Sequence, residues 1–321
     1  MNALVTGATG FIGSHLVEEL VKRGYNVTCL VRKTSDLKWI EGVTKNLYYG
    51  DCGDEKSLNG LSSDFDYVFH AAGLTKARRD EDFFYANVKG TENLLNAVSG
   101  KMPGLKRLVF LSSLAAAGPS RNGNTVNEDS EPRPVSRYGE SKLKGEQLLS
   151  GYRAGIPITI IRPPAVYGPR DRDFYVLFRM LKKGFYPYWG KCYYSLLYVE
   201  DLVAAIIRAA ESKEAEGKTY FISDSKVYSN DDIAEEIANV LQTRPIKVKI
   251  PGTLMSILIG IGGRLSSGPS LFNRDKLREL SYKSWICDPS KAEKELGFVP
   301  KVTLKEGIKW TADWYRIHQW L

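Results

Sequence analysis

The first half of the chain alternates short apolar runs with amphipathic stretches. The apolar runs, which predict β-strands, lie at residues 2–7, 26–32, 46–51, 67–73, 107–113 and 157–168. Between them, a helical period of apolar positions predicts helices at residues 13–24, 85–100 and around RYGESKLKGE, residues 137–146. Continuous apolar strands that alternate with amphipathic helices are typical of a parallel sheet that is covered on both faces. The pattern therefore predicts an α/β fold with a doubly wound parallel sheet.

The pattern changes after about Gly168, where aromatic residues become dense. Helical periods return at residues 230–241, 288–298 and 304–321, and KTYFISD at residues 218–224 is typical of a strand. We expect this strand to return to the main sheet. The sequence thus predicts one domain over residues 1–168 and a smaller, mixed α/β lobe that makes up most of residues 169–321.

The composition narrows the classes of partner. The 45 Lys and Arg residues and 37 Asp and Glu residues give a net charge of +8, but they are interspersed and form no basic block. This arrangement is typical of a solvated surface and argues against a nucleic-acid partner. Three histidines, and cysteines that form no C-x-x-C pair, argue against a metal site and a disulfide framework (Cys29, Cys52, Cys192 and Cys287). We expect reduced thiols in a cytoplasmic protein without a metal.

The longest apolar stretch lies at residues 250–263. It is too short, and too often interrupted by glycine, to span a bilayer. A buried or cleft-lining helix is the favoured interpretation, and attachment to a membrane surface is the alternative. The chain begins directly with a predicted strand, which leaves no room for a signal peptide. We therefore expect no transmembrane segment.

A glycine-rich loop connects the first predicted strand to the first predicted helix. In VTGATGFIG, Gly7, Gly10 and Gly13 are spaced G-x-x-G-x-x-G. Glycines at this junction permit a tight turn and a close backbone approach, and the helix N-terminus offers N–H donors to a pyrophosphate. Its place between strand and helix is the context that gives such a loop its meaning. We expect it to bind a dinucleotide, and the fold to be of the Rossmann type.

The end of the second predicted strand bears on the choice of dinucleotide. Proteins that prefer NAD place an Asp or Glu there, which binds the ribose 2′-hydroxyl. Here Arg32 and Lys33 are followed by Thr34 and Ser35, without an acidic residue. Two cations and two hydroxyls suit a 2′-phosphate, so we favour NADP(H) over NAD(H). The alternative is that Arg32 and Lys33 are ordinary surface residues.

Tyr138 and Lys142 stand four residues apart on a predicted helix. Residues at this spacing share a helix face, and the pair alone is common on helix surfaces. In combination with the other motifs, the chain resembles the extended short-chain dehydrogenase/reductase superfamily, also called the NAD-dependent epimerase/dehydratase family. The resemblance covers nearly the whole chain. Its matching pieces, in order, are the glycine loop, GD at 50–51, HAAG at 70–73, Asn87, LSSLAAAG at 111–118, Tyr138-x-x-x-Lys142, RPPAVYGPRD at 162–171, YVEDLVAAI at 198–206 and CDPSKAEKELGFVP at 287–300.

The resemblance implies a catalytic set. Tyr138 would be the acid/base that exchanges a proton with the substrate oxygen, and Lys142 would hold the ribose and lower the tyrosine pKa. A shift of the phenol pKa from about 10 to about 7 takes roughly 4 kcal/mol. One ammonium ~4 Å away, at an effective dielectric constant of ~20, supplies about that much. Ser113 fits as the third member because Gly118 lies five residues later, although Ser112 is a neighbour that could replace it.

The same resemblance implies the cofactor contacts. The expected cofactor-binding residues are Gly7, Thr9, Gly10, Phe11, Ile12, Gly13, Arg32, Lys33, Asp51, Cys52, Ala71, Ala72, Gly73, Asn87, Tyr138, Lys142, Pro163 and Val166. Asp51 and Cys52 would meet the adenine, and residues 163–166 would close over the nicotinamide. Asn87 is expected to brace the active-site backbone more than to touch substrate. We interpret His70 as structural, not as a base.

The substrate positions differ from those of the nucleotide-sugar branches of the family. Those branches usually have Asn where this chain has Ala165, and often Arg where it has Tyr194. Aromatic residues are dense in the lobe instead, although some must be core. This balance resembles the dihydroflavonol-reductase and 3β-hydroxysteroid-dehydrogenase-like branches. We therefore expect an oxidoreductase, a reductase or dehydrogenase of a small apolar ketone or secondary alcohol. The alternatives are a nucleotide-sugar epimerase or dehydratase with bound NAD, and a non-catalytic dinucleotide-binding protein.

The family commonly dimerises through two helices from each subunit, which together form a four-helix bundle. One is the helix after the fourth strand, and the other carries Tyr138 and Lys142. The resemblance therefore implies a homodimer for this chain.

Overall fold

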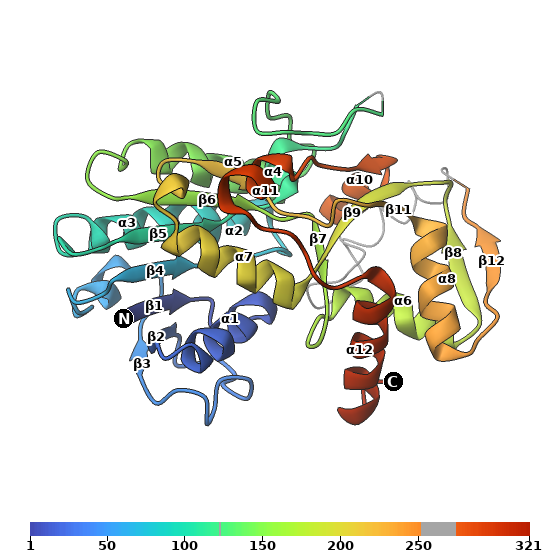
Figure 1. Cartoon of the computed structure of the whole chain (residues 1–321), viewed down its shortest axis with the longest axis horizontal. Coiled ribbons are helices and arrows are strands. Elements are labelled where there is room, and N and C mark those ends of the chain that lie inside the picture. Colours follow the sequence, from blue (N-terminus) through green and yellow to red (C-terminus); the bar gives the residue numbers. More distant parts are fainter. Residues whose placement is uncertain (122, 252–273) are drawn as a thin grey trace.

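Seven parallel strands form the main sheet of the protein (Figure 1). The computed structural model describes residues 1–121, 123–251 and 274–321. In spatial order the strands are β10 (Thr219–Phe221), β6 (Ile158–Arg162), β5 (Arg107–Leu111), β4 (Tyr67–His70), β1 (Asn2–Thr6), β2 (Asn26–Val31) and β3 (Leu47–Tyr49). The chain order reverses beside β1, which is the topological switch of a doubly wound sheet. The structure therefore confirms the predicted α/β fold of the Rossmann type.

Helices cover both faces of this sheet because its strands are apolar on both sides. Leu4 and Val5 are adjacent in β1 and both fully buried, yet they belong to different core clusters. Val5 packs with α1 (Phe11–Lys22) and α7 (Val199–Glu211), which lie side by side. Leu4 packs on the other face with α3 (Gly90–Val98) and α5 (Arg137–Ser150). The two-residue period of a strand thus divides one apolar run between two cores.

The helix predicted over residues 85–100 begins differently from its pattern. A helical segment α2 (Asp80–Phe84) continues into a π-helical turn, η2 (Tyr85–Lys89), and only then into α3. Asn87 lies inside the π-helical turn and is buried. Such turns occur often at functional sites because they change which residues face inward. The 3.6-residue period cannot predict this local change.

The stretch predicted as one strand over residues 157–168 is divided in two. Its first part is β6 of the main sheet, and its second part is β7 (Ala165–Tyr167), which pairs with β9 (Tyr193–Tyr198). Pro163 and Pro164 lie between them. Proline has no N–H to donate to a ladder, so the strand ends there and the chain leaves the main sheet. The single-strand prediction was wrong at this point.

The rest of the C-terminal part contains two small sheets and several helices. The second sheet has the order β11 (Val227–Ser229), β9 and β13 (Ser284–Trp285), with β7 also on β9, and β8 (Phe185–Tyr188) pairs with β12 (Ile246–Lys249). The larger helices here are α6 (Asp173–Lys182), α8 (Asn230–Leu241), α10 (Arg274–Leu280), α11 (Ser290–Leu296) and α12 (Leu304–Ile317). Further short helical segments among the described residues are η1 (Glu55–Leu58), α4 (Leu114–Ala117) and η3 (Lys213–Ala215). Residues 230–241 are a helix with the predicted bounds.

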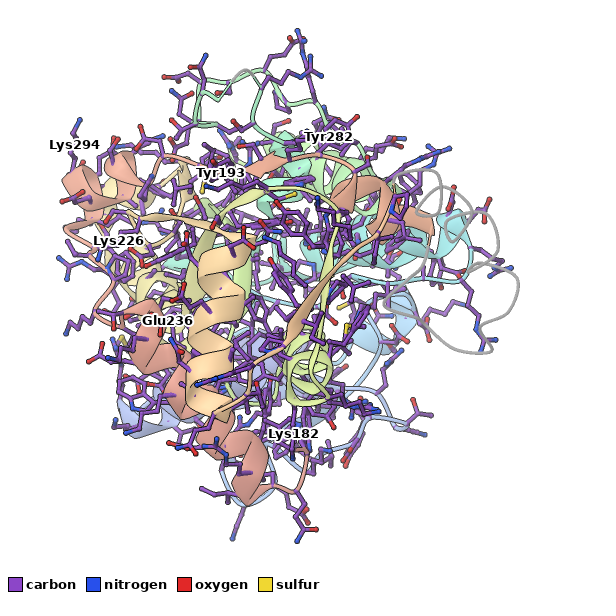
Figure 2. All side chains as sticks on the ribbon, turned by 90° about the vertical axis from the view of Figure 1, so that its right-hand side faces the viewer. Lys182, Tyr193, Lys226, Glu236, Tyr282 and Lys294 are labelled. Carbon is purple, nitrogen blue, oxygen red and sulfur yellow. The ribbon has the colours of Figure 1, made fainter. Side chains whose placement is uncertain are left out.

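Most of the dense aromatic side chains of this part form a core. Phe178, Tyr186 and Tyr198 are buried in one cluster with Tyr315 of α12. Tyr193 differs, because 41% of it is exposed. Figure 2 shows Tyr193 on the face that the C-terminal part turns to solvent, beyond the upper end of α8. The dense aromatic residues therefore mainly reflect core packing, not a binding surface.

The main sheet includes a strand from beyond the predicted domain boundary. Strand β10 belongs to the main sheet and helix α7 packs on that sheet, although both follow residue 168, so the chain crosses between its two parts several times. The domain boundary at that residue stays a prediction.

Residues 252–263 of the apolar stretch lie outside the described residues. Among the residues that are described, no helix is long and apolar enough to cross a membrane.

Candidate active site

The glycine loop packs directly against the end of β4. Gly7 has φ +69°, and a Cβ there would lie 2.6 Å from the backbone of Ala71 and Ala72. A Cβ on Gly13 would lie 2.1 Å from the carbonyl oxygen of Gly7. Gly10 is the N-cap of α1, and its N–H donates to the Gly7 oxygen over 3.0 Å. The loop therefore has the close backbone approach and the helix N-terminus that a pyrophosphate requires.

The other predicted cofactor residues follow the ends of neighbouring strands. Arg32 and Lys33 come directly after β2 and are exposed. The Arg32 N–H donates to Ser35 Oγ over 3.1 Å. The carboxyl ends of parallel strands meet at one edge of a sheet, so these residues share that edge with the glycine loop. The remaining ones occupy the same edge: Thr9, Phe11 and Ile12 at the start of α1, Asp51 and Cys52 after β3, Ala71, Ala72 and Gly73 after β4, and Pro163 and Val166 after β6.

Cys52 has a buried side chain. Burial raises the pKa of its thiol to about 12. Its carbonyl oxygen accepts a 2.8 Å hydrogen bond from Asn93 Nδ2, which ties the end of β3 to α3. Asp51 is exposed, and its Oδ1 accepts from the Gly53 N–H over 2.8 Å. Of the two residues expected at the adenine, only Asp51 has a side chain open to solvent.

Asn87 braces the loop after β4. Its Oδ1 accepts from the Leu74 N–H over 2.7 Å, and its Nδ2 donates to the Leu74 oxygen over 3.0 Å. The same Nδ2 lies 2.8 Å from Ser141 Oγ on α5. These bonds hold the end of β4 against α5, in line with the bracing role expected for this residue.

His70 has contacts that are typical of a structural residue. Its ring nitrogens lie 2.7 Å from Thr6 Oγ1 and 3.0 Å from Thr91 Oγ1. Burial, with a smaller influence from Lys142, lowers the pKa of His70 to about 3. A neutral, doubly hydrogen-bonded ring is poorly suited to act as a base, as its position in the sequence motif suggested.

Ser113, Tyr138 and Lys142 come together at the same edge of the sheet. Ser113 is the N-cap of α4, with its Oγ 3.1 Å from the Ala115 N–H, and it also hydrogen-bonds the Tyr138 side chain. Lys142 lies one turn after Tyr138 on α5 and is buried, with Nζ 4.3 Å from the centroid of the Phe110 ring. The sequence-predicted set therefore forms one cluster.

Ser112 faces away from this cluster. Its hydroxyl donates to Glu146, whose carboxylate also accepts a 2.9 Å bond from Arg162 Nε. All three side chains are buried. The question of which serine reaches the tyrosine is thus resolved by side-chain direction, because successive residues at a strand end point to opposite sides.

The electrostatics of Tyr138 differ from the sequence-based expectation. Burial raises the pKa of its phenol to about 12, and the hydrogen bond from Ser113 partly opposes this increase. Smaller influences come from Glu279, which raises the pKa, and Lys276, which lowers it. Lys142 is not among these causes, and burial lowers its own pKa to about 8. The expected lowering of the phenol pKa by Lys142 is not found in the protein alone, so Tyr138 is protonated at neutral pH.

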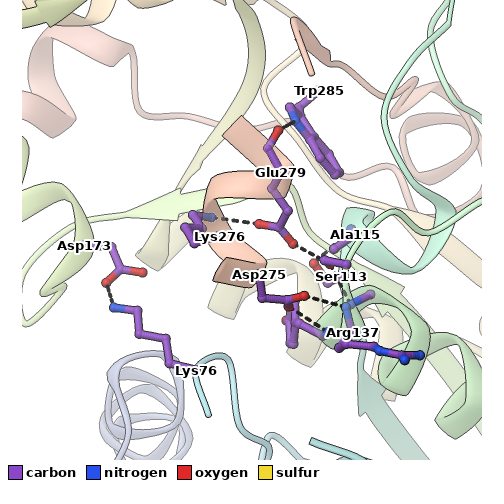
Figure 3. Close-up of polar contacts among 12 residues, drawn as sticks. Lys76, Ser113, Ala115, Arg137, Asp173, Asp275, Lys276, Glu279 and Trp285 are labelled. Carbon is purple, nitrogen blue, oxygen red and sulfur yellow. Dashed lines mark hydrogen bonds and ion pairs between the residues drawn. The ribbon is translucent and has the colours of Figure 1, made fainter. Parts of the chain in front are cut away.

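Sequence reasoning missed a group of charged residues on α10. Asp275, Lys276 and Glu279 lie against the start of α5 (Figure 3). Lys76, in the loop after β4, pairs with Asp173 at the start of α6 nearby. The sequence RDKLREL has only the appearance of a polar surface helix, and no local signal indicated that it meets residues more than a hundred positions earlier.

Ala165 and Tyr194 stand where the nucleotide-sugar branches are expected to have Asn and Arg. Ala165 lies in β7, opposite Leu196 of β9. Tyr194 lies in β9, opposite Trp285 of β13, and its side chain is half-buried. Neither side chain offers the amide or cation that would bind a diphosphate. Among the described residues, no group of His, Cys, Asp or Glu is suited to hold a metal ion.

Residues 3–223 match the sequence model of the NAD dependent epimerase/dehydratase family. The chain belongs to this family. It is therefore an enzyme of the extended short-chain dehydrogenase/reductase type, and this family uses nicotinamide dinucleotides. The glycine loop, which leaves no room for a Cβ at Gly7 or Gly13, fits such a cofactor.

Relatives within the family include both reductases and epimerases. A ceramide reductase of Caulobacter vibrioides is 31% identical over 99% of this chain and 95% of its own length. A 4-hydroxy-2-methyl-3-oxo-4-farnesyl-3,4-dihydroquinoline-1-oxide ketoreductase of Stigmatella aurantiaca is 28% identical over 96% of this chain and 95% of its own length. The structure of a Thermus thermophilus UDP-glucose 4-epimerase in complex with NAD has a TM-score of 0.78 and 26% identity, covering 98% of this chain and 99% of that one.

Proposed function

We propose that the protein is an NADP(H)-preferring reductase or dehydrogenase that acts on an apolar ketone or secondary alcohol. The observation that carries this proposal is the cluster of Ser113, Tyr138 and Lys142 beside the glycine loop. A buried, protonated phenol with a hydroxyl partner is suited to give a proton to a carbonyl oxygen. The bound cofactor would supply the hydride.

Each member of the cluster has a separate task in this proposal. Tyr138 transfers its proton to the substrate oxygen. Ser113, fixed as the N-cap of α4, orients that oxygen through its hydroxyl. Lys142 holds the ribose of the cofactor, because its ammonium lies beside the end of β4, where a Cβ on Gly73 would be 3.8 Å from Nζ. Burial of Lys142 and Asn87 keeps these positions rigid.

The preference for NADP(H) rests on the end of β2. Arg32 and Lys33 are exposed there, with no acidic residue in the turn up to Ser35. A 2′-phosphate would meet two cations and the Ser35 hydroxyl, whereas a 2′-hydroxyl would find no carboxylate acceptor.

The substrate class rests on the side chains at two positions and on the relatives. Ala165 and Tyr194 offer no group for a sugar-nucleotide diphosphate. Two relatives that span nearly the whole chain are named for reduction of lipid-like or farnesylated compounds, a ceramide and a quinoline ketone. Both features support a ketone that carries an apolar group.

A nucleotide-sugar epimerase with bound NAD is the second candidate. It is favoured by the likeness to the Thermus thermophilus epimerase over the full chain. An epimerase uses its cofactor as a transient hydride store, so it consumes none. The two candidates therefore differ in net cofactor turnover, and a non-catalytic protein would show neither reaction.

The test is a substrate panel with NADPH. We expect NADPH oxidation with ketones that carry an apolar chain, and no epimerisation of UDP-glucose with NAD. Comparing kcat/KM for NADPH and NADH in the same assay measures the cofactor preference, which we expect to favour NADPH about tenfold or more, an energy of about 1.4 kcal/mol. Epimerisation without net cofactor use would contradict the reductase proposal.

We also propose a homodimer and a cytoplasmic location. An exposed groove between the π-helical turn and α5 is lined by four apolar and four charged residues, and 60% of Tyr85 is exposed: Phe84, Tyr85, Val88 and Leu148, with Glu81, Lys89, Glu92 and Lys144. This face is the one expected to form the four-helix bundle. Sedimentation equilibrium measures the oligomeric state directly, and a monomer would contradict the proposed dimer.

Four free, buried cysteines support a reducing compartment, in line with the proposed cytoplasmic location, which cell fractionation tests.

A further inference from the structure

Helix α10 is docked onto the first turn of the helix that carries Tyr138. Asp275 Oδ1 accepts from the Arg137 N–H over 2.7 Å, and its Oδ2 accepts from the Tyr138 N–H over 3.0 Å. The first N–H groups of a helix have no partner within the helix, and a carboxylate there also suits the helix dipole. Asp275 thus holds α10 against the start of α5, where Figure 3 shows it beside Arg137.

Glu279, one turn later, is fixed by three further contacts. Its Oε1 accepts a 2.8 Å bond from Ser136 Oγ, the N-cap side chain of α5. Its Oε2 lies 3.1 Å from Lys276 Nζ, and its main-chain oxygen accepts from Trp285 Nε1 over 3.0 Å. The Glu279 side chain is 12% exposed and that of Lys276 is 44% exposed. The ion pair therefore stands at one defined place beside the N-cap of the helix that carries Tyr138, partly shielded from solvent.

The two charges of this pair act on Tyr138 in opposite directions. Glu279 raises the pKa of the phenol because a nearby carboxylate disfavours the tyrosinate. Lys276 lowers it because an ammonium favours the tyrosinate. Glu279 in turn raises the pKa of Lys276, so the lysine stays charged.

The other surroundings of Tyr138 are an aromatic ring and the charged side chains of neighbouring elements. Its ring packs against Phe83 of α2, with centroids 6.2 Å apart, and this side adds no charge. Among the described residues, the charged groups on the elements packed around the start of α5 include Arg137, Glu140 and Lys142 of α5, Asp80 of α2, Lys76 after β4, Asp173 of α6, and Asp275, Lys276 and Glu279 of α10. Of these, only Glu279 and Lys276 act on the phenol as a bonded pair of opposite sign.

We propose that the Lys276–Glu279 ion pair of α10 is part of the active site, where its opposed charges set how firmly the Tyr138 hydroxyl holds its proton. The inference rests on the proposed function, in which Tyr138 is the proton donor. During ketone reduction, bound NADPH would supply a hydride to the carbonyl carbon, and the π pair would move to the oxygen. The Tyr138 O–H bond breaks and its proton joins that oxygen. The alcohol, NADP⁺ and a tyrosinate remain, and water returns a proton to the tyrosinate.

The pair serves both ends of this step. Glu279 adds to the effect of burial, which keeps the phenol protonated before transfer, and Lys276 stabilises the tyrosinate that transfer leaves. Neither residue touches the substrate oxygen in this account, so both are positioning residues that act through Tyr138. If the pair only docked α10 onto α5, removal of either side chain would weaken the same contact and change Tyr138 in the same direction. If the charges act on Tyr138, the two removals should change it in opposite directions.

The test is the titration of Tyr138 itself, followed by NMR. Tyrosine is labelled with ¹³C at Cζ, whose resonance moves on deprotonation, and the signal missing from Tyr138→Phe identifies the residue. The titration is run on the complex with NADP⁺, because a positively charged nicotinamide ring favours a nearby tyrosinate and brings the midpoint to lower pH. This reading needs no substrate.

Two charge-removing variants make the test decisive. Glu279→Gln keeps an oxygen for Ser136 and should lower the proton affinity of Tyr138 about tenfold, one pKa unit. Lys276→Met should raise it by about the same factor. The double variant should return close to the wild-type midpoint, and Lys276→Arg, which keeps the charge, should match the wild type.

Shifts of the same sign in both single variants, or no shift in either, would overturn the proposal. The spectra report folding at the same time, so a collapsed variant is recognised, and the single variant that remains folded then carries the comparison with the wild type. Opposite shifts in a protein that reduces no ketone would leave the ion pair's role intact and instead contradict the proposed function. The two failures are therefore separable.

Discussion

The glycine loop and helix α10 meet the same site, but different kinds of interaction hold them there. The loop packs on the end of β4, but its own shape comes from bonds between residues close in sequence, such as the 3.0 Å bond from the Gly10 N–H to the Gly7 oxygen. Helix α10 is held by bonds across the fold, such as the 2.7 Å bond from the Arg137 N–H to Asp275, 138 positions apart. In our proposals, the first region binds the cofactor, and the second changes the proton affinity of Tyr138.

This difference separates a requirement that a bound dinucleotide places on the backbone from a contact that the local sequence does not determine. A dinucleotide requires a close backbone approach, and that requirement allows only glycine at Gly13, where a Cβ has no room. The charge near a proton donor can come from any element that packs against it. We therefore expect variants in the loop to abolish binding and variants in α10 to change stability and acidity by smaller amounts.

The largest effect is expected from Gly13→Ala. The added Cβ would lie 2.1 Å from the Gly7 oxygen and 2.7 Å from the Gly7 carbon, and both are backbone atoms that cannot move aside cheaply. We expect NADPH affinity to fall at least about 100-fold, an energy of roughly 2.7 kcal/mol. Isothermal titration calorimetry measures this loss.

Gly155→Ala is the matched control. A Cβ at Gly155 has no heavy atom within 4 Å. This variant should bind NADPH as the wild type does. If Gly13→Ala bound NADPH normally too, the loop would not be the pyrophosphate site.

The sequence predicted the first region well and the second hardly at all. The apolar runs and Gly7, Gly10 and Gly13 report backbone requirements that are local, so strand, loop and helix follow from them. The turn of chain direction at Pro163 and the π-helical turn at Asn87 were missed because both are exceptions to a regular period.

The chemistry of the site shows the same limit. Tyr138 and Lys142 were recognised as a pair, but the phenol's surroundings were not. Burial and Glu279 are what raise its pKa, and neither burial nor a contact across the fold can be read from Tyr-x-x-x-Lys. Side-chain direction likewise decided between Ser112 and Ser113.

A smaller effect is expected from Asp275→Ala. The variant removes the acceptor of two N–H groups at the start of α5. Loss of such a cap costs about 1–2 kcal/mol, so the melting temperature should fall by a few degrees while NADPH affinity stays unchanged. Thermal unfolding followed by circular dichroism gives the shift.

Asp129→Ala provides the comparison for that shift, because Asp129 is exposed. Its substitution should change stability by no more than about 0.5 kcal/mol. Equal melting temperatures for the two variants would mean that α10 is not anchored through Asp275.

The most direct test of the central claim compares wild type and Tyr138→Phe for NADPH oxidation with the best ketone of the panel. Phenylalanine keeps the ring that packs on Phe83 and removes only the hydroxyl. Loss of a general acid lowers the rate by a factor of about 10²–10⁴. We expect the rate of NADPH oxidation to fall by such a factor, while the affinity for NADPH stays within about twofold of the wild-type value. A variant that oxidises NADPH at the wild-type rate would contradict the assignment of Tyr138 as the proton donor.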